Sequence, residues 1–136
     1  MSHPVIELQT SIASQLNMDS TLISALGANA IFDMPPKGKS GPFMVFSRHD
    51  LIVRDADIAP GNDHRVQLSI RVPEPSRAEA LALAERVVLV LTGNELSTPD
   101  LRVTSVSHVR TDSAIELKTG RAYATIHFRI LSEPTA

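Results

Sequence analysis

The chain of 136 residues contains no cysteine and no tryptophan. The absence of cysteine excludes disulfides, thiolate metal sites and a cysteine nucleophile. Aromatic residues make up 4% of the sequence and Tyr123 is the single tyrosine, so we expect no stacking platform for single-stranded nucleic acid. The thirteen basic and fifteen acidic side chains nearly cancel. A strong overall field that would attract DNA or an anionic membrane is therefore not expected.

Long apolar runs are also missing. The most apolar run, Val87 to Leu91, is much shorter than the ~18 residues that indicate a membrane span. The N-terminus lacks the basic and apolar regions of a secretory signal, and no motif repeats with a period of roughly 20–50 residues. A hydrophobic fraction of 43% is ordinary for a globular protein. These features predict one soluble domain over residues 1–136 that folds in the cytoplasm.

Three segments have the apolar spacing of helices. The first runs from Pro4 to Leu16, with proline in the first turn, where its missing N–H is not needed. The second, from Asp19 to Leu26, is short and ends before a glycine. The third begins at Ser76 and Glu79, which have the spacing of a capping box, and extends to about Leu91. Its expected buried stripe consists of Leu81, Ala84, Val88 and Leu91.

Strand patterns occupy most of the remaining chain. Apolar and polar residues alternate from His64 to Val72 and from Ala122 to Leu131, which is typical of strands with one buried face. Weaker patterns cover Ala30–Asp33, Pro42–Arg48 and Leu101–Arg110. The order of elements predicts an α+β fold with a single antiparallel or mixed sheet of about four to five strands and two to three helices on one face.

The sequence offers little support for an enzyme. Gly38-Lys39-Ser40 has the end of a phosphate-binding loop, but Asp33 stands where the motif needs glycine. His64 and His127 could meet across paired strands, yet no third metal ligand is evident. The Asp55–Asp57 segment lacks the pattern of a calcium loop, and G-x-S-x-G does not occur. We therefore expect no catalytic residues, no cofactor and no metal.

An interaction surface is the better hypothesis, because arginine outnumbers lysine ten to three and is favoured at interfaces. Arginines project from the polar faces of the predicted strands, next to an acidic connection over 50–63 and a basic loop over 34–41. In a ring, the acidic connection of one subunit could meet the basic loop of the next. A solvated sheet face is the alternative. The predicted interface residues are Lys37, Lys39, Asp50, Asp55, Asp57, Asp63, Arg65, Arg71 and Arg129.

The order and spacing of short motifs over nearly the whole chain resemble one family. These motifs begin with the first helix and Leu22–Leu26, and continue through Ile31-Phe32-Asp33 with Pro35, Pro42-Phe43-Met44-Val45, His64, Leu68 and Ile70, Ser76-Arg77, Glu79-Ala80, Leu83-Ala84, Leu101-Arg102-Val103-Thr104, Asp112, Gly120, Phe128-Arg129 and Glu133. The sequence resembles the tail-terminator, or tail-completion, proteins of long-tailed phages and gene transfer agents.

The resemblance implies a structural virion protein without catalytic residues. Members of the family form a ring, usually a hexamer, at the head-proximal end of the tail tube. The ring stops growth of the tube and joins the tail to the head. The implied partners are further copies of the chain, the major tail tube protein and the head–tail connector, and DNA passes through the ring without sequence-specific binding. The implied location is the virion tail, after assembly in the cytoplasm of a bacterial host.

Three other functions are alternative hypotheses for this sequence. A head-completion or neck adaptor of the same particle would need similar surfaces. A small monomeric binding module could use the arginine-rich face alone. A small hydrolase would need His64 or His127 beside an aspartate, and the spacing of the sequence does not support that arrangement.

Overall fold

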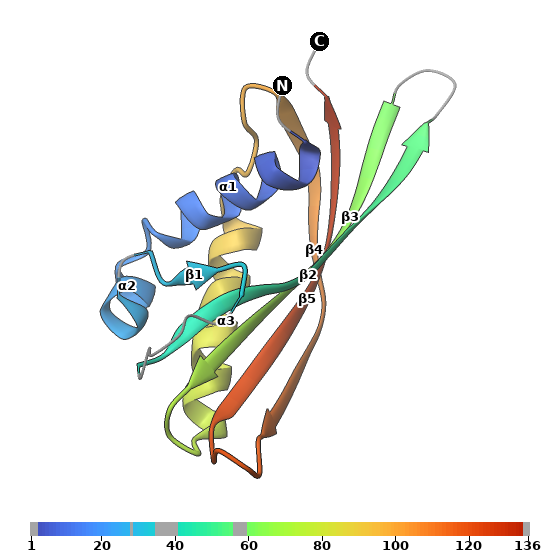
Figure 1. Cartoon of the computed structure of the whole chain (residues 1–136). Coiled ribbons are helices and arrows are strands. Elements are labelled where there is room, and N and C mark those ends of the chain that lie inside the picture. Colours follow the sequence, from blue (N-terminus) through green and yellow to red (C-terminus); the bar gives the residue numbers. More distant parts are fainter. Residues whose placement is uncertain (1–2, 28, 35–40, 56–59, 135–136) are drawn as a thin grey trace.

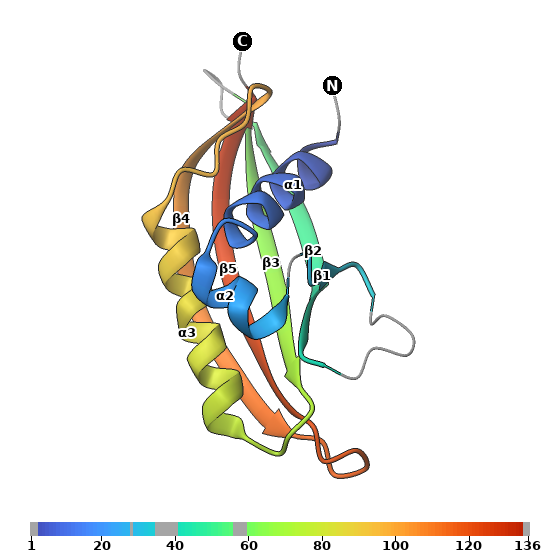
Figure 2. The same cartoon turned by 90° about the vertical axis from the view of Figure 1, so that its left-hand side faces the viewer.

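The computed structural model describes residues 3–27, 29–34, 41–55 and 60–134. Three helices lie on one face of a single twisted sheet, and the other face has no helix over it in this part of the chain (Figures 1 and 2). The two layers confirm the predicted α+β fold. The elements in chain order are α1 (Pro4–Leu16), α2 (Ser20–Leu26), β1 (Ile31–Phe32), β2 (Phe43–Asp55), β3 (Pro60–Val72), α3 (Arg77–Gly93), β4 (Leu101–Ile115) and β5 (Ala122–Pro134).

The sheet has five strands in the order β1-β2-β3-β5-β4. The short edge strand β1 runs parallel to β2, and the other neighbours are antiparallel, so the sheet is mixed. The opposite edge strand, β4, contains two bulges, after Val103 and after His108. Bulges at an edge interrupt the row of free backbone groups that would otherwise invite another strand.

The two N-terminal helices agree with the sequence prediction. Helix α1 buries Leu8, Ile12 and Leu16 on one face. Helix α2 begins after Asp19, whose carboxylate accepts a hydrogen bond from the N–H of Leu22 at 3.1 Å. It ends before a glycine with a φ of 85°, a conformation that other residues rarely adopt.

Helix α3 begins at the predicted cap, where the Ser76 hydroxyl accepts a hydrogen bond from the N–H of Glu79 at 3.2 Å. The predicted buried stripe was partly wrong, because Leu81 is exposed and Val88 is half-buried. The helix contacts the sheet on one side and α1 and α2 on another, so its buried face is wider than a single stripe. That face contains Ala80, Leu83, Ala84, Val87, Val90 and Leu91.

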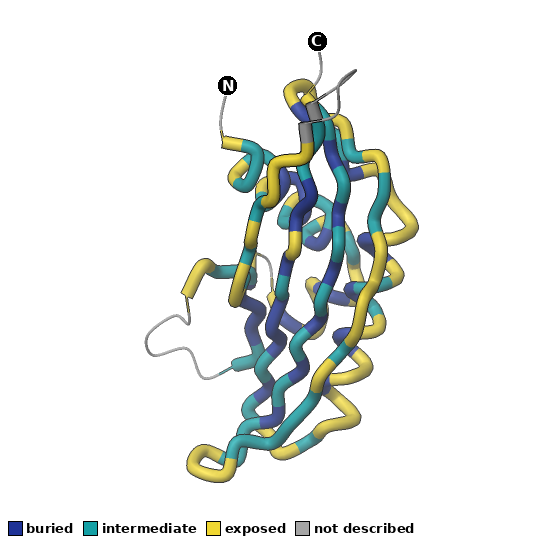
Figure 3. The backbone as a smooth tube through the Cα atoms, turned by 90° about the vertical axis from the view of Figure 1, so that its right-hand side faces the viewer, coloured by how far each residue is buried: buried dark blue, intermediate teal, exposed yellow. Residues whose placement is uncertain are grey.

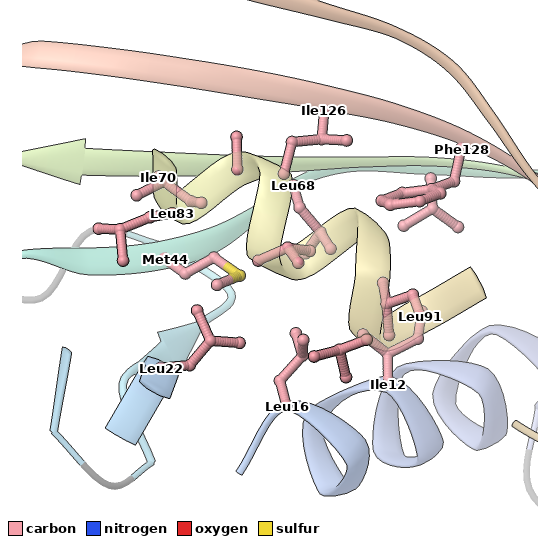
Figure 4. Close-up of a cluster of buried hydrophobic side chains, with 14 of the residues drawn as sticks. Ile12, Leu16, Leu22, Met44, Leu68, Ile70, Leu83, Leu91, Ile126 and Phe128 are labelled. Carbon is pink, nitrogen blue, oxygen red and sulfur yellow. The ribbon is translucent and has the colours of Figure 1, made fainter. Parts of the chain in front are cut away.

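The core fills the space between the helices and the inner face of the sheet, by which we mean the face toward the helices. Leu68 of β3 and Phe128 of β5 lie opposite Leu91 of α3 and Ile12 of α1 (Figure 4). Buried and partly exposed residues alternate along the central strands, whereas in β4 only Leu101 is buried and the other residues are intermediate or exposed (Figure 3). The predicted period of two is therefore confirmed for β3 and β5.

The predicted acidic connection over residues 50–63 was wrong. Strand β2 continues to Asp55 and β3 already begins at Pro60, so Asp50 and Asp63 are strand residues that pair with Arg65 and Ile52. Polar residues occupy both faces of this end of the hairpin, which conceals the strand period from a sequence reading. Strands β4 and β5 are longer than predicted for the same reason.

None of the helices in the described ranges is both long and apolar enough to cross a membrane.

Candidate functional site

The outer face of the sheet, opposite the helices, carries a large share of the charge. The strand register places seven arginines and four carboxylates on it. These are Arg48, Arg54, Arg65, Arg71, Arg102, Arg110 and Arg129, with Asp50, Asp63, Asp112 and Glu133. Among the other side chains that the structure describes, four are basic and nine are acidic. The outer face is therefore net positive and the rest of the described surface is net negative.

Asp63 lies at the centre of the strongest ionic group on this face. Its side chain is fully buried although no helix covers it. Arg54 Nε donates to Oδ2 at 3.0 Å, Arg65 Nε donates to Oδ1 at 3.0 Å, and Arg129 Nη2 donates to Oδ2 at 3.0 Å. We call Asp63 with Arg54, Arg65 and Arg129 the Asp63 cluster. The three guanidinium groups shield the carboxylate from water.

The register explains why the cluster forms. Arg65 of β3 stands directly opposite Arg129 of β5, and two like charges in such a pair repel each other. The Asp63 carboxylate accepts hydrogen bonds from both and relieves this repulsion. The hydrogen bonds from Arg65 and then Arg129 hold the pKa of Asp63 well below its usual range, against the opposing effect of burial. Asp63 is thus ionised at neutral pH.

The remaining charges on the outer face form weaker contacts. Arg48 and Asp50 are 2.8 Å apart, Arg110 and Asp112 are 3.3 Å apart, and Arg102 pairs with Glu133. The arginines in these pairs are about two-thirds exposed, and exposed pairs of this kind contribute little to stability. They leave the face polar, ordered and accessible.

Arg71 lies at the other end of the outer face. Its guanidinium carbon is 6.0 Å from the centre of the Tyr123 ring, which is within range of a cation–π contact. Its Nε is buried and has no hydrogen-bond partner among the described residues. Arg71 therefore makes fewer stabilising contacts within the fold than Arg129 does.

The two histidines proposed as a possible pair do not meet. His64 is on the inner face and fully buried, whereas His127 is on the outer face and lies 2.9 Å from an oxygen of Asp112. His64 instead contacts His49 of β2, with 2.8 Å between Nε2 of His49 and Nδ1 of His64. Because β2 has a bulge between Phe46 and Arg48, the sequence pattern alone does not show which face His49 occupies.

The contact between His127 and Asp112 places a histidine beside an aspartate, as the hydrolase hypothesis requires, but among the described residues no hydrogen bond joins this pair to a serine or threonine hydroxyl. The described part of the chain contains no group of three or more His, Cys, Asp or Glu side chains that could hold a metal ion. An open cleft of about 450 Å³ between α1 and α3 contains Asp19 and Arg86. These two form an ion pair of 2.6 Å, and Asp19 also caps α2. The polar groups in the cleft thus hold helices together.

The structure brings four of the predicted interface residues together. Asp50, Asp63, Arg65 and Arg129 lie at the same end of the outer face, and Arg71 lies at the other. Lys37, Lys39 and Asp57 are outside the described residues, as is the side chain of Asp55. Arg54 was missed, because the predicted strand ended at Arg48. The apolar run Leu51-Ile52-Val53, which includes two β-branched residues, is a weak strand signal that could have revealed it.

No curated protein matches the chain. Among solved structures, a chain described as part of the "Virion of native gene transfer agent (GTA) particle" is 24% identical, with a TM-score of 0.83 over 97% of this chain and 99% of that one. That similarity shows a common fold. The family model described as "Tail completion protein gp17" matches residues 10–133. This match covers most of both layers of the fold, and the protein therefore belongs to the tail completion protein gp17 family, as a structural protein of a phage-like tail.

Proposed function

We propose that the protein forms a ring, a hexamer as the family resemblance implies, at the head-proximal end of a tail tube. There it stops growth of the tube and joins the tail to the head. The observation that carries this proposal is the family match over residues 10–133. The gene transfer agent particle, which contains a chain of the same fold, is an assembly of the kind in which such a ring would act.

The charge distribution supports a head-to-tail contact between subunits. A ring forms when each subunit presents two different, complementary surfaces and the rotation between neighbours closes. The outer face of the sheet is net positive and the remaining described side chains are net negative. Two such surfaces on one subunit attract when copies associate head to tail.

The predicted interface residues take different parts in this proposal. Arg65, Arg71 and Arg129 offer guanidinium groups to a neighbour, and Asp50 contributes from β2. Asp63 is buried beneath its arginines, so it acts by fixing their positions rather than by touching a neighbour. Lys37 and Lys39, which precede β2 in the sequence, with Asp55 at the end of β2 and Asp57 after it in the sequence, would form a second contact between neighbours.

The other partners follow from the position of the ring. One rim would bind the major tail tube protein and the other the head–tail connector, with contacts of roughly 800 Å² on each partner. DNA would pass through the hole without sequence-specific contacts. A near-neutral chain suits such a passage, because many phosphate contacts would hold the DNA.

Electron microscopy of particles from a strain that lacks the gene would test this function. We expect overlong or unstable tails that are not joined to filled heads, and restoration by the wild-type gene supplied in trans. Free tails of normal length would instead indicate a neck adaptor. Normal tails joined to filled heads would refute both functions.

A further inference from the structure

The Asp63 cluster contains more positive charge than its carboxylate can balance. Three guanidinium groups surround one ionised carboxylate, so the four side chains of the cluster together carry a net charge of two positive units. Asp63 neutralises one of the three positive charges and reduces the repulsion between the arginines, and two positive charges remain unbalanced within the cluster. A further anion placed beside these arginines would be attracted to them. This excess points to an anionic partner.

The arginines are positioned to receive that partner. The side chains of Arg54, Arg65 and Arg129 are 58%, 47% and 43% exposed, while each donates at least one hydrogen bond to the buried carboxylate. Every guanidinium carries five N–H donors. Asp63 therefore fixes the orientation of the three groups and leaves donors on the solvent side. A bound anion would find them already ordered, which lowers the entropic cost of binding.

The surroundings favour a protein carboxylate over the phosphates of DNA. Ile52 pairs with Asp63 across the hairpin and is 43% exposed, so an apolar side chain borders the cluster. Asp50 and Asp112 on the same face would repel a continuous polyanion. All seven basic residues on the face are arginines, which are enriched at protein interfaces where lysines are depleted. A mixed surface of this kind fits an acidic patch of a protein.

A second copy of the chain offers carboxylates of this kind. Among the described side chains outside the outer face, nine are acidic and four are basic. Two outer faces would repel each other, which opposes a twofold dimer through this surface and favours a contact between unlike surfaces. We propose that the Asp63 cluster is a docking site for carboxylates on the acidic surface of a neighbouring copy. This inference rests on the proposed ring and names the partner of its outer face.

The test compares two charge reversals in the purified full-length protein. Arg54→Glu removes the most exposed arginine of the cluster and leaves Arg65 and Arg129 to satisfy Asp63. Arg77→Glu is the matched control, because it makes the same change in net charge at an exposed position at the start of α3. Arg54→Lys keeps the charge without the planar fork. Thermal unfolding first establishes that the variants fold, and sedimentation velocity at low and high salt then measures self-association.

We expect wild-type association to weaken with salt, and Arg54→Glu to weaken it about tenfold or more at low salt while reducing its salt dependence. Arg77→Glu should stay within a factor of about three, and Arg54→Lys should fall between the two reversals. The inference would be overturned if both charge reversals weakened self-association equally, or if the Arg54→Glu protein associated as strongly as the wild type. It would also be overturned if the wild-type protein did not self-associate.

Two further readouts separate this inference from its alternatives. If Arg54→Glu lowers the affinity for a short duplex DNA and leaves self-association unchanged, the cluster serves nucleic acid and the inference is wrong. Complementation of the deletion strain addresses the proposed function separately. A deletion with normal tails would refute the tail function, even if Arg54→Glu still abolished self-association. If the deletion strain has defective tails and the Arg54→Glu gene restores them as well as the wild-type gene does, the inference is refuted and the proposed tail function stands.

Discussion

Nε2 of His49 lies 2.8 Å from Nδ1 of His64, with the two ring centres 5.1 Å apart. His64 Nε2 lies 2.9 Å from the Ser132 hydroxyl, and the Gln9 amide nitrogen is 3.2 Å from His49 Nδ1. One set of tautomers satisfies every contact, with Gln9 donating to His49, His49 to His64 and His64 to Ser132. This polar chain connects α1 to three strands and requires both imidazoles to be neutral.

Acid should therefore destabilise the protein. Burial lowers the pKa of both His49 and His64 to about 4, despite the nearby carboxylates of Asp50 and Asp63. An unfolded histidine has a pKa near 6.5, so the unfolded chain binds more protons between pH 6.5 and 4. The free energy of unfolding should be highest above pH 6.5 and fall by about 3 kcal/mol or more at pH 4. Urea unfolding at several pH values measures this.

His64→Gln provides the corresponding control. It should lower stability at pH 7 and flatten the decline between pH 6.5 and 4, because fewer protons are taken up on unfolding. His108→Gln, at an exposed position on β4 outside the polar chain, should lower stability at pH 7 less than His64→Gln does. A wild-type profile that is flat over this range would contradict the account.

Replacement of Asp63 should be costly. Asp63→Asn leaves three guanidinium groups without their anion and should lower the free energy of unfolding by about 3–5 kcal/mol. Asp50→Asn removes a half-exposed carboxylate on the same face and should cost less than about 1 kcal/mol. Chemical denaturation at pH 7 compares the two. A loss for Asp63→Asn no larger than for Asp50→Asn would show that the cluster does not stabilise the fold.

Asp19 joins two helices and should contribute accordingly. Its carboxylate caps α2 and forms a bidentate pair with Arg86 of α3. Asp19→Ala should cost about 1–3 kcal/mol, and Asp19→Asn should retain most of the cap and lose the charge pair. Ser76→Ala removes a cap alone and should cost about 1 kcal/mol. Melting temperatures provide the comparison, and an Asp19→Ala protein as stable as the wild type would disprove the linking role.

The core between the layers should tolerate truncation poorly. Leu68 and Phe128 are essentially fully buried, so replacement of either by alanine should cost about 2–5 kcal/mol through the cavity that remains. Leu117 is 98% exposed at the β4–β5 turn, and its replacement by alanine should change stability by less than about 0.5 kcal/mol. Denaturant unfolding checks both, and similar losses at buried and exposed positions would argue against the described core.

Arg71 and Arg129 looked equivalent in the sequence, and the structure separates them. Arg129→Glu should lower both stability and assembly, because Arg129 donates to the buried Asp63. Arg71→Glu should impair assembly more than folding. Among the described residues, the ring of Tyr123 is the one ionic or aromatic partner of the Arg71 guanidinium. Melting temperature and particle yield measured for each variant test this. Equal losses of both quantities for Arg71→Glu would assign it a structural role.

Local patterns predicted most elements of the fold. The alternation in β3 and β5, the cap at Ser76 and the glycine after Leu26 each depend on neighbouring residues, so a sequence contains them in full. The strand ends were less predictable. Around Asp50 and Asp63 both faces are polar, and pairing with a partner strand rather than local periodicity holds these residues in the sheet.

The sequence by itself determined an α+β domain rich in arginine, without a recognisable active site and similar in its motif order to tail-completion proteins. Only the tertiary structure decided which charges meet. Arg54, Asp63 and Arg129 are brought together by the register of three strands, and His49 meets His64 because a bulge sets the face of β2. Residues far apart in the chain are positioned by pairing and packing over the whole sheet, which local sequence patterns do not specify.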